Sequence, residues 1–275
     1  MIASVLFFLY FVTMLNVHKK NDFPAIIAHR GASYHAPENT LAAVRLAWEL
    51  DADGVEIDVH LTPDKRIVVI HDATTKRTAK KNLTVGVTPS TELRNLDAGI
   101  VKFPKCAGQK IPFIEEILTT LPDNKKLFIE IKCGKEIVPL LRTTIIKKGK
   151  ISQIVIMGFD LDTVSGAKKI MPELPVYWLV NTRTNGFTRK FLPYDSEIIT
   201  RALASNIDGL SARYPGITGD FAEMVKSSGL ELYAWTVNSH KEAVRLTKLG
   251  VDGIITNRPG WLANKLKQHV QTEST

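Results

Sequence analysis

The feature that most limits how this chain can fold is a repeated alternation of strand-like and helix-like segments. Short apolar runs rich in β-branched residues are separated by segments with apolar residues at helical spacing. The run that begins at Ile67 follows so closely on the previous one that we expect it to return as a hairpin, which leaves eight strands. The nine runs start at or near Ala25, Val55, Ile67, Leu127, Gln153, Val176, Gly209, Leu230 and Gly253.

Strands that alternate with helices form parallel sheets. Eight such units over roughly 250 residues predict an α/β fold of the (β/α)8 or TIM-barrel type. A doubly wound open sheet is the alternative, but no Gly-x-Gly-x-x-Gly turn follows any strand, which disfavours a dinucleotide-binding sheet. The helices predicted in the second half are Leu161–Ile170, Ile198–Ser205, Thr218–Ser228 and His240–Leu249.

The charge balance is basic. The 275 residues include 36 Lys and Arg against 28 Asp and Glu, a formal charge of +8. Such a surface suits nucleic acid, anionic lipid or phosphate-bearing substrates. No basic helix and no zinc-finger spacing is present, so we expect no nucleic-acid partner. The two cysteines, Cys106 and Cys133, form neither a metal-ligand pattern nor a disulfide framework.

The N-terminus is apolar from Ile2 to Val17 and is followed by Lys19 and Lys20. It lacks the basic start and small-residue cleavage site of a secretory signal. We therefore expect residues 1–20 to form an uncleaved hydrophobic anchor that associates the protein with a membrane, rather than a signal for secretion. The two lysines favour a cytoplasmic position for the rest of the chain. A start codon assigned too early is the alternative.

Two carboxylates share one face of the strand Gly54–Leu61. Alternation places Glu56, Asp58 and His60 on the face opposite Ile57 and Val59. Neighbouring carboxylates repel each other unless a cation lies between them or water surrounds them. The pair is therefore either a metal site or a solvated strand edge.

A turn signal at Thr62–Lys65 predicts that the strand folds back as a hairpin at Asp64 and Lys65. This folding places His71 opposite Asp58, within cross-strand reach. The segment from Ala73 to Lys110 that follows lacks periodicity and resembles an insertion with a little helix of its own.

In a barrel, functional groups gather where the strands end. Three carboxylates there suit a hard cation such as Mg²⁺ or Ca²⁺. An arginine and a lysine suit a phosphate, and two histidines suit general acid and base. Together they indicate metal-assisted phosphodiester cleavage, with Trp235 as a wall of the pocket and His60 and His35 as incidental surface residues. The strand-end residues that we expect to act are His29, Arg30, Glu56, Asp58, His71, Glu130 and Lys132.

These motifs resemble the glycerophosphodiester phosphodiesterase family. The resemblance extends from about Ile26 to Pro259. The matching motifs are His29-Arg30-Gly31, Pro37-Glu38-Asn39-Thr40, Glu56-Ile57-Asp58-Val59, His71-Asp72, Ile114-Glu115-Glu116-Ile117-Leu118, Glu130-Ile131-Lys132, Trp235-Thr236-Val237-Asn238, and Asp252-Gly253-Ile254-Ile255-Thr256-Asn257-Arg258-Pro259.

The resemblance implies a phospholipase-C-like barrel over residues 24–265, with residues 73–110 as its small insertion. It also implies roles. Glu56, Asp58 and Glu130 would hold Mg²⁺ or Ca²⁺, His29 and His71 would be the acid–base pair, and Arg30 and Lys132 would bind phosphate. The products would be glycerol 3-phosphate and an alcohol.

Some features stay open. Glu38 is expected to support His29 or contact the glycerol, and the stretch Asn181–Arg189, which matches no family motif, to shape the leaving-group pocket. The alternative functions are a lysophospholipase D or sphingolipid headgroup phosphodiesterase, and a non-catalytic phosphate- or lipid-binding barrel.

Overall fold

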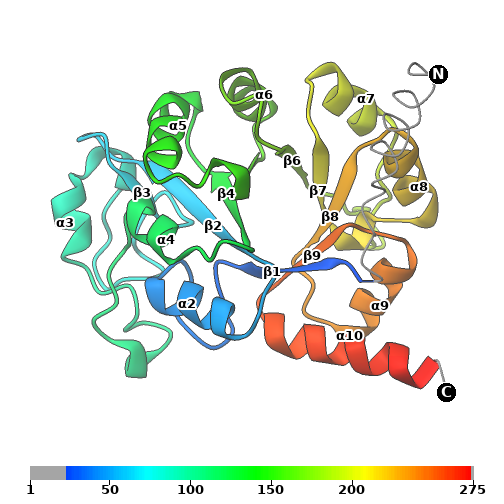
Figure 1. Ribbon diagram of the computed structural model, residues 1–275, viewed down its shortest axis with the longest axis horizontal. Helices are drawn as coiled ribbons and strands as arrows, with labels where there is room; N and C mark the ends of the chain where they lie inside the picture. The colour runs from blue at the N-terminus through cyan, green and yellow to red at the C-terminus, as the bar shows by residue number, and fades with distance from the viewer. Residues whose placement is uncertain (1–22, 274–275) are drawn as a thin grey trace, which may run out of the picture.

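The computed structural model describes residues 23–273, which form a ring of parallel strands surrounded by helices (Figure 1). The ring is closed because β1 pairs with both β2 and β9. Its closure confirms the predicted TIM barrel and excludes the open sheet. The strands, in chain order, are β1 (Ala25–His29), β2 (Gly54–Leu61), β4 (Lys126–Ile131), β5 (Ile154–Gly158), β6 (Val176–Val180), β7 (Gly209–Arg213), β8 (Glu231–Trp235) and β9 (Gly253–Thr256).

Strand β3 (Ile67–Val69) runs antiparallel to β2, as the hairpin prediction requires. The predicted register is wrong by one residue, because Asp58 lies opposite Ile70, whose backbone N–H donates to the Asp58 carbonyl at 3.0 Å. The cause is the turn. Thr62 pairs with Arg66 around a three-residue loop whose last residue, Lys65, has φ 59°, which is a common hairpin loop geometry.

His60 was expected to be an incidental surface residue, and this expectation is wrong. Its side chain is buried, and its Nε2 lies 3.1 Å from the backbone oxygen of His71. The contact ties β2 to the end of the hairpin return. His60 therefore helps to fix the position of His71 without lining the pocket described below.

An outer layer of helices covers the barrel. Polar side chains cap several of them: Thr40 accepts a hydrogen bond from the Ala43 N–H, and Asp160 does the same for Thr163. The four predicted helices are present, but α5 and α10 were not identified from the sequence. The helices are α2 (Leu41–Glu49), α3 (Ser90–Arg94), α4 (Ile114–Thr120), α5 (Val138–Lys147), α6 (Leu161–Ile170), α7 (Glu197–Ala204), α8 (Gly219–Ser227), α9 (His240–Lys248) and α10 (Pro259–Glu273).

The barrel interior is filled by its own apolar cluster, separate from the core between strands and helices. The rings of Phe128, Tyr177 and Tyr233 lie within 5.1–6.2 Å of one another. Gly253 makes room for them, since a Cβ there would lie 2.1 Å from a Tyr233 ring carbon. Because side chains alternate along a strand, the next inward-facing residues toward the carboxyl ends of the strands line a pocket there. They include the polar Glu56 and Glu130 as well as the apolar Met157, Leu179 and Ile255.

The segment 73–110 leaves the barrel after β3 and contains α3 and two short 3₁₀ turns, Val85–Val87 and Pro104–Cys106. Leu93 and Val85 pack with Val68 of β3 in a small core of their own. The expected anchor, residues 1–20, lies outside the described residues. Within residues 23–273 no helix is both long and apolar enough to span a bilayer.

Candidate active site

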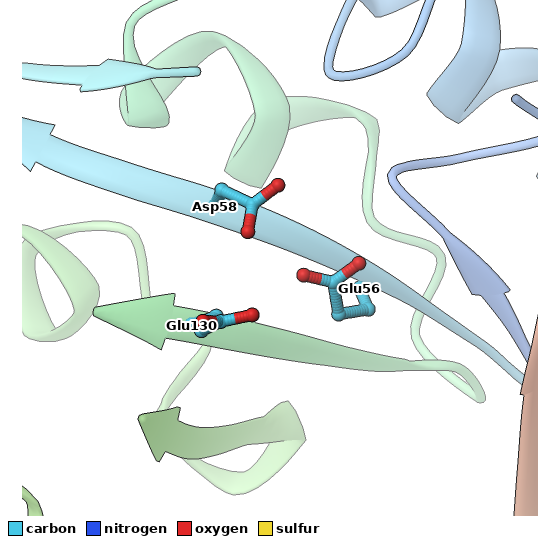
Figure 2. Close-up of side chains that lie close together, drawn as sticks. All are labelled: Glu56, Asp58 and Glu130. Atoms are coloured by element: carbon cyan, nitrogen blue, oxygen red, sulfur yellow. The ribbon is translucent and has the colours of Figure 1, made fainter. Parts of the chain in front are cut away.

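Three carboxylates converge inside the carboxyl end of the barrel. Asp58 pairs directly with Glu130 in the register of β2 and β4, and Glu56 lies one inward step back along β2. Each contributes an oxygen, and these oxygens all lie within 4.8 Å of one another. Figure 2 shows the three side chains facing a common space between the two strands. All three are buried, which excludes the solvated strand edge.

The pKa values of the three carboxylates are shifted in different directions. Burial, together with the charges of Asp58 and Glu130, raises the pKa of Glu56 well above its usual value. Burial and Asp58 raise the pKa of Glu130 to about 7, against the opposing influence of Lys132. Burial also disfavours ionised Asp58, but Lys132 and Arg30 outweigh it and hold its pKa below the usual value.

This donor set fits a divalent cation. Within the described chain, Glu56 Oε1 is buried and accepts no hydrogen bond, although a buried carboxylate oxygen normally has a partner. Three hard oxygen ligands with mutual repulsion are what Mg²⁺ or Ca²⁺ neutralises. The residues that would hold the ion are Glu56, Asp58 and Glu130, as the sequence predicts.

Two cations border the carboxylates. Arg30 Nε lies 3.1 Å from Asp58 Oδ2, and Lys132 Nζ lies 3.2 Å from Asp58 Oδ1 and donates to Glu130. The Arg30 backbone adopts φ 55° and its N–H donates to Glu56 Oε2 at 2.8 Å. Gly31 follows at φ 78°, where a Cβ would lie 2.5 Å from the Ala43 carbonyl carbon. Only glycine fits this turn.

His29, at the end of β1, is held through one ring nitrogen. Its Nδ1 lies 2.7 Å from Asn257 Oδ1, and an amide oxygen accepts, so Nδ1 donates. Nε2 is then the free nitrogen, 4.0 Å from Glu56 Oε2. Burial, together with the positive charge of Arg30, lowers the pKa of His29 to about 4. The imidazole is therefore neutral near pH 7 and is able to accept a proton.

His71 is held in a different way. Its Nδ1 lies 2.6 Å from Asp72 Oδ1, and Arg77 donates to both oxygens of Asp72. Burial lowers the pKa of His71, whereas the charge of Asp58 and the hydrogen bond to Asp72 act in the opposite direction. A carboxylate partner stabilises the imidazolium form better than an amide does. The two histidines are therefore unequal.

The histidines, both cations and two of the carboxylates line one pocket of about 130 Å³. Its outer wall is aromatic: the Trp235 indole N–H donates to the Ser211 carbonyl at 2.9 Å, and the Phe159 ring stands edge-on to it with centroids 5.6 Å apart. Trp235 thus occupies the predicted wall position. Asp58 lies beneath this surface and is completely buried.

A sequence profile of the glycerophosphoryl diester phosphodiesterase family matches residues 29–261. This chain belongs to that family. A glycerophosphodiester phosphodiesterase of Caldanaerobacter subterraneus subsp. tengcongensis is 35% identical over 251 residues, covering 88% of this chain and 98% of the relative. A human lysophospholipase D is 25% identical over 296 residues, covering 91% and 89%.

The fold comparison agrees. A phosphodiesterase from Oleispira antarctica, solved with the product sn-glycerol-3-phosphate, superposes with a TM-score of 0.79 at 25% identity, covering 89% of this chain and 97% of that one. This phosphodiesterase is accordingly a phosphoric diester hydrolase, and a non-catalytic barrel is set aside.

Several positioning residues of the phosphodiesterase were missed from the sequence. Asn39 precedes Thr40, the residue that caps α2. Asn39 donates to Asp58 Oδ2 at 2.7 Å and accepts from the Asp58 N–H at 3.1 Å. Asn257 belongs to the motif of residues 252–259, but the motif does not indicate its contact with His29. Asn257 directly follows β9, and Asn39 lies two residues before α2. Sequence spacing alone could not connect them to His29 or Asp58.

Glu38 does not support His29 as one expectation held. It accepts a hydrogen bond from Arg30 at 2.7 Å and two from Arg77, at 2.7 and 2.9 Å. Arg77 lies in the 73–110 segment and joins Glu38 to Asp72. Because this pairing links positions 39 residues apart, nothing in the local sequence indicates it.

Proposed function

We propose that this phosphodiesterase hydrolyses glycerophosphodiesters to glycerol 3-phosphate and an alcohol such as choline or ethanolamine, with a divalent cation and two acid–base histidines. The observation that carries the proposal is that His29 and His71 line one pocket with Arg30 and Lys132, beside three buried carboxylates. Mg²⁺ or Ca²⁺ bound there would supply positive charge to the phosphoryl oxygens.

Substrate binding and proton transfer are assigned to residues of the chain itself. Arg30 and Lys132 orient the phosphodiester and offset negative charge that develops on its oxygens. One histidine takes the proton from the nucleophile, which is water or the neighbouring glycerol hydroxyl, and the other gives a proton to the departing alcohol. The amide partner of His29 favours the base role, and the carboxylate partner of His71 favours the acid role.

A change of leaving group tests this assignment. His71→Ala should lower kcat on glycerophosphocholine by roughly 10²–10⁴-fold. The loss should be much smaller on a glycerophosphodiester with a p-nitrophenol leaving group, which departs without protonation. His29→Ala should be equally impaired on both. If the p-nitrophenyl substrate rescued His29→Ala instead, the two roles would be reversed.

Removal of the metal tests the cation. Thorough chelation should abolish turnover, and added Mg²⁺ or Ca²⁺ should restore it, which also identifies the preferred ion. Activity that survived chelation would refute the metal dependence without touching the histidine assignment.

A second candidate is lysophospholipase D activity. The human relative carries that name at 25% identity, and the aromatic wall of Phe159 and Trp235 offers apolar surface at the pocket mouth. Glycerophosphocholine and lysophosphatidylcholine supplied together, with both free headgroup and lipid product measured, would show which substrate has the higher kcat/KM.

A further inference from the structure

The connection between β6 and α7 projects from the carboxyl end of the barrel. Residues 183–192 form a small hairpin: Leu192 N–H donates to the Arg183 carbonyl and Asn185 N–H donates to the Lys190 carbonyl, both at 2.8 Å. Phe187 lies at the tip of this hairpin and is fully exposed. In Figure 1 the connection rises between β6 and α7, beyond the ends of the strands.

Exposed apolar side chains continue from the hairpin to the catalytic pocket. Phe191 and Leu192 are 38% and 39% exposed, and Phe159, at the pocket mouth, is 44% exposed. A cavity of about 430 Å³ beside the hairpin is lined by Leu192, Phe159 and Leu179, and the last two also line the catalytic pocket. The cavity is also lined by polar residues, among them Asp195 and Glu197. The two cavities therefore share part of their apolar wall, Phe159 and Leu179.

The same hairpin is strongly basic. It contains Arg183, Arg189 and Lys190, and residues 181–194 include no Asp or Glu. In the part of the chain described by the structure, none of these three cations has an ion-pair partner. A fourth cation, Arg213 at the end of β7, lies over the Phe191 ring at 4.9 Å.

We propose that this hairpin docks the mouth of the active site onto an anionic lipid bilayer, with Phe187 inserted into the interface. Aromatic side chains favour the membrane–water boundary, and basic residues near an anionic surface each contribute about 1 kcal/mol, roughly a fivefold factor in affinity. The hairpin has an aromatic side chain at its tip for the interface and unpaired cations beside it for the anionic lipid. Absence of lipid contact in the experiment below would exclude the bilayer as the occupant of this surface.

Quenching by brominated lipid tests the contact at the tip itself. Phe187→Trp in the complete chain adds one indole to the four native ones. Its added emission should be quenched by vesicles of brominated phosphatidylglycerol and much less by brominated phosphatidylcholine. The control, Ile146→Trp, lies at the end of α5, where the chain returns to the opposite end of the barrel. Quenching of Phe187→Trp no greater than that of the control would overturn the proposal.

The role of the cations is tested in the Phe187→Trp protein. Adding Arg189→Gln and Lys190→Gln should raise the lipid concentration for half-maximal quenching about 25-fold, from two fivefold factors. The matched pair Lys147→Gln and Lys148→Gln, both exposed at the end of α5, should leave it unchanged. Every variant retains residues 1–22, so any contribution of these residues to lipid binding is the same in all of them. An unchanged midpoint in the hairpin variant would refute charge-dependent docking.

A kinetic comparison rests on the proposed function. Phe187→Ser should lower kcat/KM for lysophosphatidylcholine embedded in anionic vesicles and leave kcat/KM for soluble glycerophosphocholine unchanged. Equal loss on both substrates would place Phe187 in catalysis and contradict docking. Failure of the wild-type protein on both substrates would refute the proposed function, while the quenching results would still decide the docking proposal.

Discussion

At the scale of single residues, the site is a compact balance of opposite charges. Arg30 Nε lies 3.1 Å from one oxygen of Asp58 and Lys132 Nζ lies 3.2 Å from the other, whereas within the described chain Glu56 forms no ion pair with a lysine or an arginine and, of the basic side chains, only His29 lies near it, at 4.0 Å. Neighbouring carboxylates of one strand therefore have different electrostatic environments. The difference predicts different effects of neutralising them.

Glu56→Gln should weaken the binding of Mg²⁺ or Ca²⁺ by more than the 10–100-fold typical of residues that only support a ligand. In metal-free protein it should leave stability unchanged or increase it, because it removes like-charge repulsion with Asp58 and Glu130. Titration calorimetry and urea unfolding measure the two effects. A metal-free protein strongly destabilised by this change would contradict the assignment.

Asp58→Asn should weaken metal binding as well, but it should also destabilise the metal-free protein, since it leaves Arg30 and Lys132 without their shared buried counter-charge. The same two measurements apply, and Glu56→Gln is the matched comparison. Equal stability of the two metal-free variants would show that the cations do not depend on Asp58.

At the scale of elements, the 73–110 segment is connected to catalysis through Arg77. Arg77→Ala should lower kcat with little effect on KM, because Asp72 and Glu38 lose the partner that holds them toward His71 and Arg30. Arg77→Lys should restore part of the activity, and the exposed neighbour change Lys76→Ala should have no effect. A loss confined to KM would argue against a positioning role.

The same contacts predict a pH dependence of stability. Burial raises the pKa of Glu38, but Arg77 and Arg30 outweigh it and lower the pKa to about 2. Arg77 also lowers the pKa of Asp72 to about 2. Unfolded carboxyls titrate near pH 4, so the stabilisation is complete above about pH 5 and is lost as pH falls toward 2.

Wild-type protein should therefore be more stable than Arg77→Ala at pH 6, and this difference should shrink as the pH falls from 5 to 3. Urea midpoints measured at each pH, with Lys76→Ala as the control, would check it. A difference that stayed constant across the range would show that the carboxylates are not the groups stabilised by Arg77.

A comparison of predicted and observed elements shows which features the local sequence determines. The predicted range of α6 is the observed one, and the structure brings His29, His71 and Trp235 together around one pocket at the carboxyl end of the barrel. The hairpin register was missed by one residue because it depends on the left-handed conformation of Lys65, which no residue type there requires. The roles of Asn39 and Asn257 were missed because they depend on contacts with Asp58 and His29, which lie 19 and 228 positions away in the sequence.

At the scale of the whole molecule, closure of the barrel depends on fitting large rings beside small residues. Gly253→Ala places a Cβ against the Tyr233 ring, and such overpacking should cost about 1–3 kcal/mol. Gly86→Ala, which has open space around its Cβ position, is the matched control and should be close to neutral. Urea unfolding of both variants measures the two free-energy changes. Equal stabilities would show that the Tyr233 ring can move aside without cost.

The barrel itself could be predicted because eight strand–helix units leave few arrangements. The sequence could not show which inward positions carry the large rings, since the packing of Phe128, Tyr177 and Tyr233 against Gly253 and its neighbours joins four strands. The stretch Asn181–Arg189 was expected to shape the leaving-group pocket, and the exposed tip of the hairpin that it enters, at Phe187, is visible only in three dimensions.

The layer of Phe128, Tyr177 and Tyr233 affects the order in which product leaves and substrate binds. These buried rings close the barrel directly beneath the polar residues, so the catalytic chamber is blind-ended. Whatever enters past Phe159 and Trp235 has to leave by the same mouth. Within the described residues 23–273, the phosphate ester that is formed and the next diester therefore share the opening at the carboxyl end of the barrel, and the ester must depart before the diester can bind.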